Sequence, residues 1–304
     1  MHPNRRRVLQ GLAVIAAAGL PRVSRSQGAA PARKAIPSSG ETIPVVGLGT
    51  WITFNVGDDP VLRAESADVM AAFFEAGGRV IDSSPMYGSS QDVIGYGLER
   101  TGIPEDLFAA DKVWTSSPGE GRAQMEQSRK LWGIERFDLM QVHNLVAWQA
   151  HLETLFEMKA AGEIRYVGIT TSENRRHGLF EEIMASLPLD FVQVTYNLVD
   201  RVVENRILPL ARERGMAVMV NRPFRQGALI RRLEGAPLPS WAGEIGAETW
   251  AQFILKFIVS HPDVTVAIPA TTRVDHVREN VAAGLGPFPD DAMRRQMAAY
   301  VREL

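Results

Sequence analysis

The sequence predicts a single-domain α/β protein with the (β/α)8 TIM-barrel fold. Short apolar runs alternate with amphipathic helical stretches along the chain, and strands that alternate with helices form parallel sheets. The composition, 45% hydrophobic and 22% charged over 304 residues, is that of a globular chain long enough for one large barrel. We favour a closed barrel over an open doubly wound sheet, which the same alternation also allows.

The apolar runs predict eight strands, which lie near residues 43–49, 79–82, 107–113, 137–143, 164–169, 190–196, 216–220 and 264–268. Helical periodicity is clear in several of the stretches between them, at 62–76, 122–132, 150–161 and 250–259. The longest irregular connection is predicted at 222–247, where Gly and Pro are frequent. At the mouth of a barrel, a loop of this length is typical of a lid or of a segment that holds a cofactor.

The first thirty residues are predicted to lie outside the barrel. Adjacent Arg5 and Arg6 stand in a basic start, and a run of small and apolar residues follows from 11 to 20. This order resembles a twin-arginine export signal, with Val8 and Leu9 as the apolar partners of the arginine pair.

We therefore expect a signal peptide over 1–30, with cleavage near 26–30, followed by a barrel domain over 31–304. The twin-arginine export machinery would be a partner, and the folded protein would be periplasmic or secreted. About ten apolar residues fall short of the roughly 20 that span a bilayer, so a stable membrane anchor is disfavoured. A disordered basic arm is the remaining alternative.

Composition excludes several classes of function. A net charge of −2 gives no basis for binding nucleic acid or an anionic membrane. Cysteine is absent, which excludes disulfides and thiol catalysis. The six histidines show no spacing typical of metal ligands, so no metal site is predicted.

Four polar residues lie at or just after the ends of three predicted strands. Asp82 ends the second predicted strand, Lys112 lies near the end of the third, and His143 closes the fourth, while Tyr87 follows in the loop after Asp82. Because neighbouring parallel strands lie about 4.8 Å apart, these side chains are expected to form one site. Alone, His143 would be a core histidine and Tyr87 a loop aromatic; Lys112 is harder to explain, because lysines are rarely buried without a partner.

This combination suits the reduction of a carbonyl group. Asp82 would hold Lys112 charged, Lys112 would lower the pKa of Tyr87, and His143 would orient the carbonyl. Tyr87 is then a plausible general acid for the developing oxyanion.

In order and spacing, these four residues resemble the catalytic tetrad of the aldo-keto reductase family. Gly47-Leu48-Gly49-Thr50 before them and Ile268-Pro269 with Glu279-Asn280 after them extend the resemblance to positions 41–303. It implies a barrel enzyme that reduces an aldehyde or ketone to an alcohol with NADPH, with Tyr87 as general acid.

The resemblance also implies where NADP(H) binds, with NAD(H) as the less favoured cofactor. Position by position it assigns cofactor contacts to Thr170, Thr171, Gln193, Arg222, Thr271, Arg273, Glu279 and Asn280. No G-x-G-x-x-G motif follows the first strand, which argues against a Rossmann-type site. A phosphate site near strands seven and eight of a barrel is the expected alternative, although the stretch from 268 to 273 taken alone equally fits a capped helix with an exposed arginine.

The sequence departs from the family pattern in three respects. Thr170-Thr171 replaces the usual Ser-Asn pair, and Asn221 stands where an aromatic residue commonly stacks on the nicotinamide. Ala270 and His276 replace two cations that often contact the 2′-phosphate, which leaves Arg273 as the main cation.

Further residues after the strand ends are candidates for the substrate pocket: Trp51, Met86, Trp114 and Asn144. Two other functions stay open at this point. The first is an exported dinucleotide-binding redox sensor with little turnover. The second is a barrel enzyme that uses Asp82 and a nearby Glu in sugar hydrolysis or isomerisation, although it leaves Tyr87, Lys112 and His143 unexplained.

Overall fold

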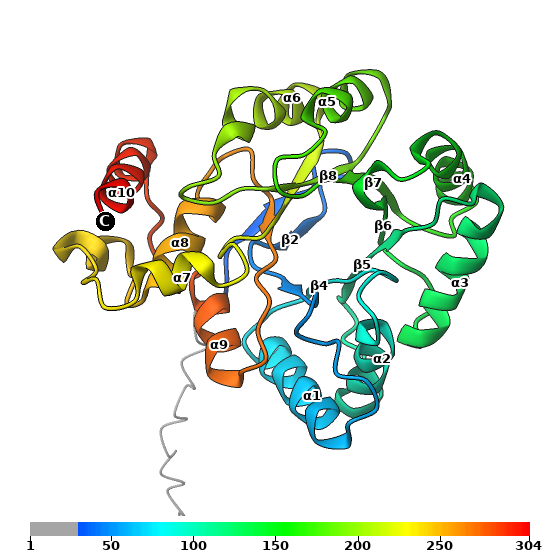
Figure 1. The fold of residues 1–304 in the computed structure, drawn as a ribbon, viewed down its shortest axis with the longest axis horizontal. Helices are drawn as coiled ribbons and strands as arrows, with labels where there is room; N and C mark the ends of the chain where they lie inside the picture. Colours follow the sequence, from blue (N-terminus) through cyan, green and yellow to red (C-terminus); the bar gives the residue numbers. More distant parts are fainter. Residues whose placement is uncertain (1–29) are drawn as a thin grey trace, which may run out of the picture.

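Eight parallel strands form the barrel that the sequence predicts, with helices arranged around it (Figure 1). The structure, a computed structural model, describes residues 30–304. Each strand pairs with its neighbour in the chain, so the order around the sheet is the order in the sequence. The barrel strands are β3 (Leu48–Gly49), β4 (Val80–Asp82), β5 (Phe108–Val113), β6 (Leu139–Val142), β7 (Tyr166–Thr170), β8 (Phe191–Thr195), β9 (Ala217–Asn221) and β10 (Val266–Ala267).

The barrel closes where the chain around β3 meets β10. Val46 and Ala267 form a parallel bridge there. The Ala267 amide donates to the Val45 carbonyl at 2.9 Å, and the Gly47 amide donates to the Ala267 carbonyl at 2.8 Å. These hydrogen bonds satisfy the backbone groups that an open sheet edge would leave unpaired.

Two glycines allow this close approach. A Cβ atom at Gly49 would lie 2.7 Å from the Ile268 carbonyl oxygen, and one at Gly47 would lie 2.9 Å from the Val80 carbonyl oxygen. Because both obstacles are backbone atoms, they cannot move aside as a side chain would. Glycine is therefore required here for space, independently of its backbone freedom.

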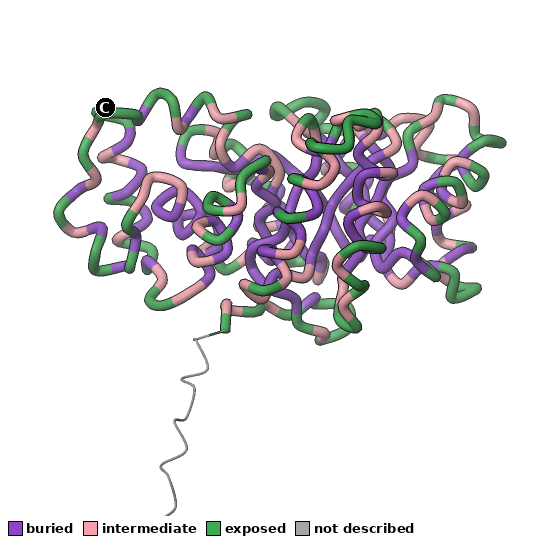
Figure 2. The backbone as a smooth tube through the Cα atoms, turned by 90° about the horizontal axis from the view of Figure 1, so that it is seen from below, coloured by how far each residue is buried: buried purple, intermediate pink, exposed green. Residues whose placement is uncertain are grey.

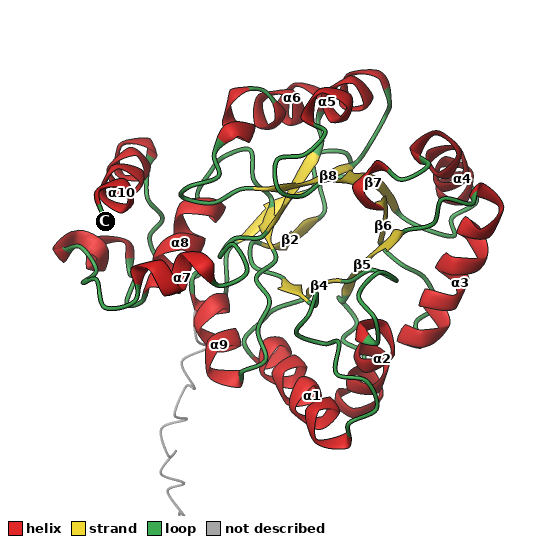
Figure 3. Cartoon of the chain, in the orientation of Figure 1, coloured by secondary structure: helices red, strands yellow, loops and turns green. Residues whose placement is uncertain are grey.

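A helix follows each barrel strand, as Figure 3 shows. These eight helices are α1 (Pro60–Glu75), α2 (Ser90–Thr101), α3 (Gly121–Trp132), α4 (Trp148–Ala160), α5 (His177–Ser186), α6 (Ile207–Arg214), α8 (Trp250–Val259) and α9 (Val274–Ala282). Two more are α7 (Ala228–Leu233), between β9 and α8, and the final α10 (Asp291–Glu303). None of the helices in the described part of the chain is long and apolar enough to cross a membrane.

Local sequence explains several helix starts. Asp59 caps α1, its carboxylate accepting from the amides of Val61 and Leu62 at 2.9 and 3.1 Å. Pro60 occupies the first helical position, where its missing amide costs nothing. Thr249 and Asp290 cap α8 and α10 in the same way.

The core has two layers, inside and outside the barrel wall, and Figure 2 shows the buried residues concentrated in the interior of the molecule. The larger cluster packs the helices against the strands. The smaller one fills the amino-terminal end of the barrel, where the first residues of β5 to β9 meet Ile36 and Ile43. These two isoleucines belong to a hairpin of β1 (Arg33–Ala35) and β2 (Thr42–Pro44), which closes that end and leaves the opposite end for the site.

All eight predicted strands are present, but the extent of one strand and the irregular character of one connection were wrong. The apolar run at 43–49 is divided, because Thr42–Pro44 pairs antiparallel in the hairpin and only Leu48–Gly49 forms a barrel strand. The connection at 222–247 is not wholly irregular, because it contains α7 and a 3₁₀ turn at Ser240–Ile245. Hydrophobic periodicity over so few residues does not distinguish a short strand or helix from an irregular loop.

Candidate active site

The carboxyl ends of β4, β5 and β6 bring three of the predicted site residues together. Asp82 is the last residue of β4, Lys112 is the penultimate residue of β5, and His143 directly follows β6. Side chains alternate along a strand, so Lys112 faces into the barrel while its neighbour Asp111 faces the helices. The three side chains come from consecutive strands, as their order in the sequence indicated.

Lys112 and Asp82 form a buried ion pair. The Lys112 ammonium lies 2.5 Å from the Asp82 carboxylate and 2.6 Å from the Ser83 carbonyl oxygen, with side-chain exposures of 0% and 2% for the pair. Burial lowers the pKa of Lys112, but its interactions with Asp82, Tyr87 and Asp111 together raise it by more, so the net pKa is above its ordinary value. Lys112 is therefore a fixed positive charge beneath the site.

Tyr87 lies over this charge. The Lys112 ammonium is 5.1 Å from the centre of the Tyr87 ring, and the ring meets His143 edge-on with centroids 5.7 Å apart. Burial raises the pKa of the phenol, and Lys112 opposes that rise without cancelling it. The expectation of a lowered pKa was therefore wrong for this state of the site: the lysine acts in the expected direction, but desolvation is the larger effect.

His143 is held as a neutral imidazole. Burial, and then the positive charge of Lys112, lower its pKa to about 3. Its Nδ1 lies 2.8 Å from the hydroxyl of Ser84, a residue that sequence reasoning did not single out. The only sequence signal for Ser84 was its place between Asp82 and Tyr87.

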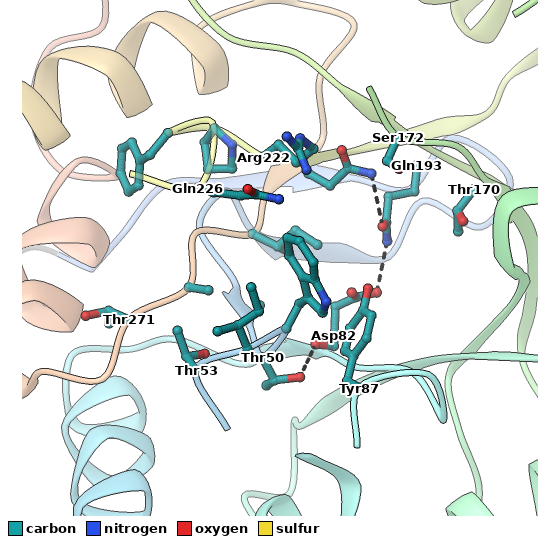
Figure 4. A pocket seen from close by; sticks show the side chains of 18 of the residues that line it. Thr50, Thr53, Asp82, Tyr87, Thr170, Ser172, Gln193, Arg222, Gln226 and Thr271 are labelled. Atoms are coloured by element: carbon teal, nitrogen blue, oxygen red, sulfur yellow. Dashed lines mark hydrogen bonds between the residues drawn. The ribbon is translucent and has the colours of Figure 1, made fainter. Parts of the chain in front are cut away.

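A cavity of about 590 Å³ opens above these residues (Figure 4). Asp82, Tyr87 and His143 line it, together with three of the four predicted pocket residues, Trp51, Met86 and Asn144. The fourth, Trp114, does not line the cavity. Its side chain is 41% exposed, because the loop after β5 carries it toward α3, where its backbone bonds to Gln124.

Most of the predicted cofactor contacts line the same cavity: Thr170, Thr171, Gln193, Arg222, Thr271 and Arg273. Glu279 and Asn280 do not line it. Both lie in the second half of α9, and Asn280 is buried with 4% exposure. The first turn of α9 reaches the cavity, whereas its later turns do not.

Gln193 and Asn221 bond to the protein rather than projecting freely into the cavity. The Gln193 amide nitrogen donates to the Asp82 carboxylate at 2.9 Å, and its oxygen accepts from Asn221 at 3.3 Å (Figure 4). Asn221 also donates to the Thr171 carbonyl at 2.9 Å and accepts from Thr195 at 2.7 Å. Asn221 thus joins the ends of β7, β8 and β9 by hydrogen bonds, in the place where the family resemblance implied an aromatic platform.

The cations at the cavity already have acidic partners, which the sequence did not indicate. Arg222 pairs with Glu173 at 3.1 Å, so the loops after β7 and β9 meet across the site. Arg273, the main cation expected for a 2′-phosphate, pairs with Asp275 in the first turn of α9. Any added anion must compete with these carboxylates.

Backbone strain concentrates in the same loops. All ten non-glycine residues with positive φ in the described part of the chain lie in four loops after β3, β6, β7 and β9: Ile52, Asn144, Leu145, Ala147, Glu173, Asn174, Arg176, Arg222, Arg225 and Gln226. Left-handed backbone is costly for such residues and persists where surrounding contacts enforce it. Its restriction to the cavity end marks that end as the functional face.

Comparison with known proteins agrees with this geometry. The chain is 28% identical over 259 residues to methylglyoxal reductase YeaE of Escherichia coli, covering 82% of this chain and 89% of that protein. It is 24% identical over 307 residues to an NADH-specific methylglyoxal reductase of the same organism, covering 80% and 90%.

A solved structure of an aldo/keto reductase from Klebsiella pneumoniae, in complex with NADP and acetate, shares the fold. Its TM-score is 0.72 at 24% identity, over 86% of this chain and 93% of that one. The sequence also matches the model of the Aldo/keto reductase family over residues 45–300. The match covers most of the barrel, and the chain therefore belongs to the aldo/keto reductase family.

Proposed function

We propose that this protein reduces an aldehyde or ketone to an alcohol with NADPH as the hydride donor. The observation that carries the proposal is the group of Asp82, Lys112, Tyr87 and His143, in which the buried Lys112 lies against Asp82 and Tyr87, and the other three line one cavity. Tyr87 supplies the proton to the carbonyl oxygen, and its raised pKa keeps the phenol protonated at neutral pH. Neutral His143 orients the same oxygen.

Lys112 and Asp82 support this proton transfer without touching the substrate. The fixed charge of Lys112 stabilises the phenolate that remains after Tyr87 has given up its proton. Asp82, with Gln193 as a further hydrogen-bond donor to it, keeps Lys112 in place. In the proposed reaction, Tyr87 supplies the one proton that the substrate oxygen receives.

The residues along the cavity fit a dinucleotide. The cavity extends from Tyr87 to Thr271 and Arg273 at the amino terminus of α9, where helix amides and a guanidinium suit an anionic phosphate. Thr170, Thr171, Gln193 and Arg222 would lie along its length. When bound, the nicotinamide supplies the hydride that the carbonyl carbon accepts.

The choice between NADPH and NADH depends on Arg273. It is the main cation available to a 2′-phosphate, yet it is paired with Asp275. One of the similar proteins is named as NADH-specific, which makes a direct comparison necessary. We expect NADPH to bind more tightly than NADH when both are titrated by fluorescence against the purified protein.

The first test is replacement of the proposed acid. In Tyr87→Phe, reduction should fall by about 10²–10⁴-fold, the usual contribution of general acid catalysis, because the substrate oxygen loses its proton donor. Dinucleotide binding should be nearly unchanged. The measurement is loss of absorbance at 340 nm with a panel of aldehydes and ketones, including methylglyoxal.

Tyr300→Phe is the matched control, because it removes a phenol on α10 that bonds only to the Pro237 carbonyl. It should leave turnover unchanged. Full activity in Tyr87→Phe would overturn the assignment. Tight dinucleotide binding by the unaltered protein without carbonyl-dependent turnover would instead favour a dinucleotide-binding sensor.

We also propose export of the folded protein by the twin-arginine machinery to the periplasm or beyond. The support is the sequence around Arg5 and Arg6, which lies outside the described residues. A barrel that folds before transport can bind its dinucleotide in the cytoplasm and carry it across.

A further inference from the structure

Ser84 contacts both the loop of Tyr87 and the side chain of His143. It lies in the loop after β4 and is fully buried. Its carbonyl oxygen accepts from the Tyr87 amide at 2.9 Å, and its hydroxyl oxygen accepts from the Met86 amide at 3.2 Å. The same hydroxyl oxygen is 2.8 Å from Nδ1 of His143.

The proton between Ser84 and His143 can be placed by counting donors and acceptors. A neutral imidazole carries a single N–H, and the low pKa of His143, about 3, keeps the ring neutral at physiological pH. Among the described residues, Nδ1 of His143 is the only acceptor that the Ser84 hydroxyl reaches.

If Nδ1 carried the proton, the Ser84 oxygen would receive two N–H groups while its own O–H had no acceptor. Leaving a buried donor unsatisfied is unfavourable. The alternative satisfies every group: Ser84 donates to Nδ1, and the histidine proton resides on Nε2.

We propose that Ser84 is a positioning residue that fixes His143 in the tautomer with its proton on Nε2. Since Nδ1 is bound to Ser84, Nε2 is the ring nitrogen left for the cavity that His143 lines. His143 then donates a hydrogen bond to the substrate, as Tyr87 does, and two converging donors select an oxygen without a hydrogen of its own. The catalytic consequence, although not the tautomer itself, rests on the proposed carbonyl reductase function.

The direct test is NMR spectroscopy of the full chain labelled with ¹⁵N-histidine, recorded near pH 7 with and without NADP⁺. Two-bond proton–nitrogen correlations distinguish the tautomers, and His143→Asn identifies the signal among the six histidines. We expect protonated Nε2 and bare Nδ1 in the unaltered protein. A proton on Nδ1 would overturn the proposal, and this outcome needs no variant to fold.

The second test is Ser84→Ala with kinetics. The variant should lose the single tautomer in the NMR spectrum, and kcat should fall by about tenfold, the factor expected for loss of one orienting hydrogen bond. The dissociation constant of the dinucleotide should not change, because Ser84 does not line the cavity. Ser84→Thr, which keeps the hydroxyl, should restore both the tautomer and kcat.

Ser90→Ala is the matched control, because it removes another fully buried hydroxyl whose partner is Ser83. It should alter neither the His143 signal nor kcat. An unchanged tautomer in Ser84→Ala would overturn the proposal. If the tautomer is fixed by Ser84 but no carbonyl compound is reduced by the unaltered protein, the positioning role stands and the proposed function fails.

Discussion

At the scale of single residues, the site is organised around one buried charge. Lys112 is fully buried and its ammonium has two oxygen partners, Asp82 and the Ser83 carbonyl. A buried ion pair adds little net stability, but removal of one partner leaves the other charge uncompensated. Removal of either Asp82 or Lys112 alone is therefore expected to destabilise the fold, and the function that we propose requires both.

Lys112→Met should lower the free energy of unfolding by about 3–5 kcal/mol, because Asp82 is left buried without its cation. In the double variant Lys112→Met with Asp82→Asn, more than half of this loss should be recovered, since neither charge is then present. Urea unfolding at pH 7 measures both values. Equal stability of the single and double variants would show that the Asp82 charge is compensated elsewhere. Neither variant should reduce carbonyl compounds at an appreciable rate.

At the scale of secondary structure, β5 buries one charged residue on each of its two faces, Lys112 inside the barrel and Asp111 outside it. Inside the barrel, Lys112 has its ion pair. Outside it, Asp111 lies between β5, α2 and α3, with Gln91 donating to one carboxylate oxygen at 2.6 Å and the other oxygen without a partner. Burial raises the pKa of Asp111 to about 7, although Lys112 opposes the rise. Above about pH 7, where the buried Asp111 ionises, it therefore lowers the free energy of unfolding.

The raised pKa of Asp111 predicts that the free energy of unfolding falls as pH rises. The folded pKa of this carboxyl group lies above its unfolded value of about 3.9. Below pH 4 the group is protonated in both states and does not destabilise the fold. As pH rises from 4 toward 7 only the unfolded state ionises, so the free energy of unfolding falls. Asp111→Asn removes this titration. The variant should therefore be more stable than the unaltered protein at pH 8, by on the order of 2–4 kcal/mol, and close to it at pH 4. Urea unfolding at the two pH values checks this, and an equal effect at both would contradict the buried, titrating carboxylate.

At the scale of the whole molecule, the barrel separates stability from function. The hairpin of β1 and β2 fills one end, while the loops with left-handed backbone surround the cavity at the other. Charge plays little part at this scale, because a net charge of −2 gives no strong field. Location in the cell is decided by the first thirty residues rather than by the barrel, if our proposal on export is correct.

Replacement of Arg5 and Arg6 by lysine should abolish most export, because the twin-arginine machinery reads the arginine pair itself. The measurement is the fraction of the chain in the periplasm of an expressing bacterium, by fractionation and immunoblot. Arg7→Lys is the matched control, since it changes a neighbouring arginine outside the proposed pair. An unchanged periplasmic fraction in the double replacement would remove the export proposal and leave the basic arm.

The sequence by itself determined the barrel and the grouping of Asp82, Lys112 and His143. Each lies at the end of a short apolar run, and in a barrel consecutive strands are neighbours, so order along the chain becomes order in space. Tyr87 was predictable for the same reason, because a short loop keeps it near Asp82.

The contacts of individual side chains were decided only by the tertiary structure. The bond from Gln193 to Asp82 spans 111 positions, and that from Ser84 to His143 spans 59. Trp114 directly follows β5 and Asn280 lies in α9, but neither residue lines the cavity, because packing sets the direction of each side chain. The net rise in the pKa of Tyr87 has the same origin: local sequence shows which charges are near, whereas desolvation depends on everything packed around the ring.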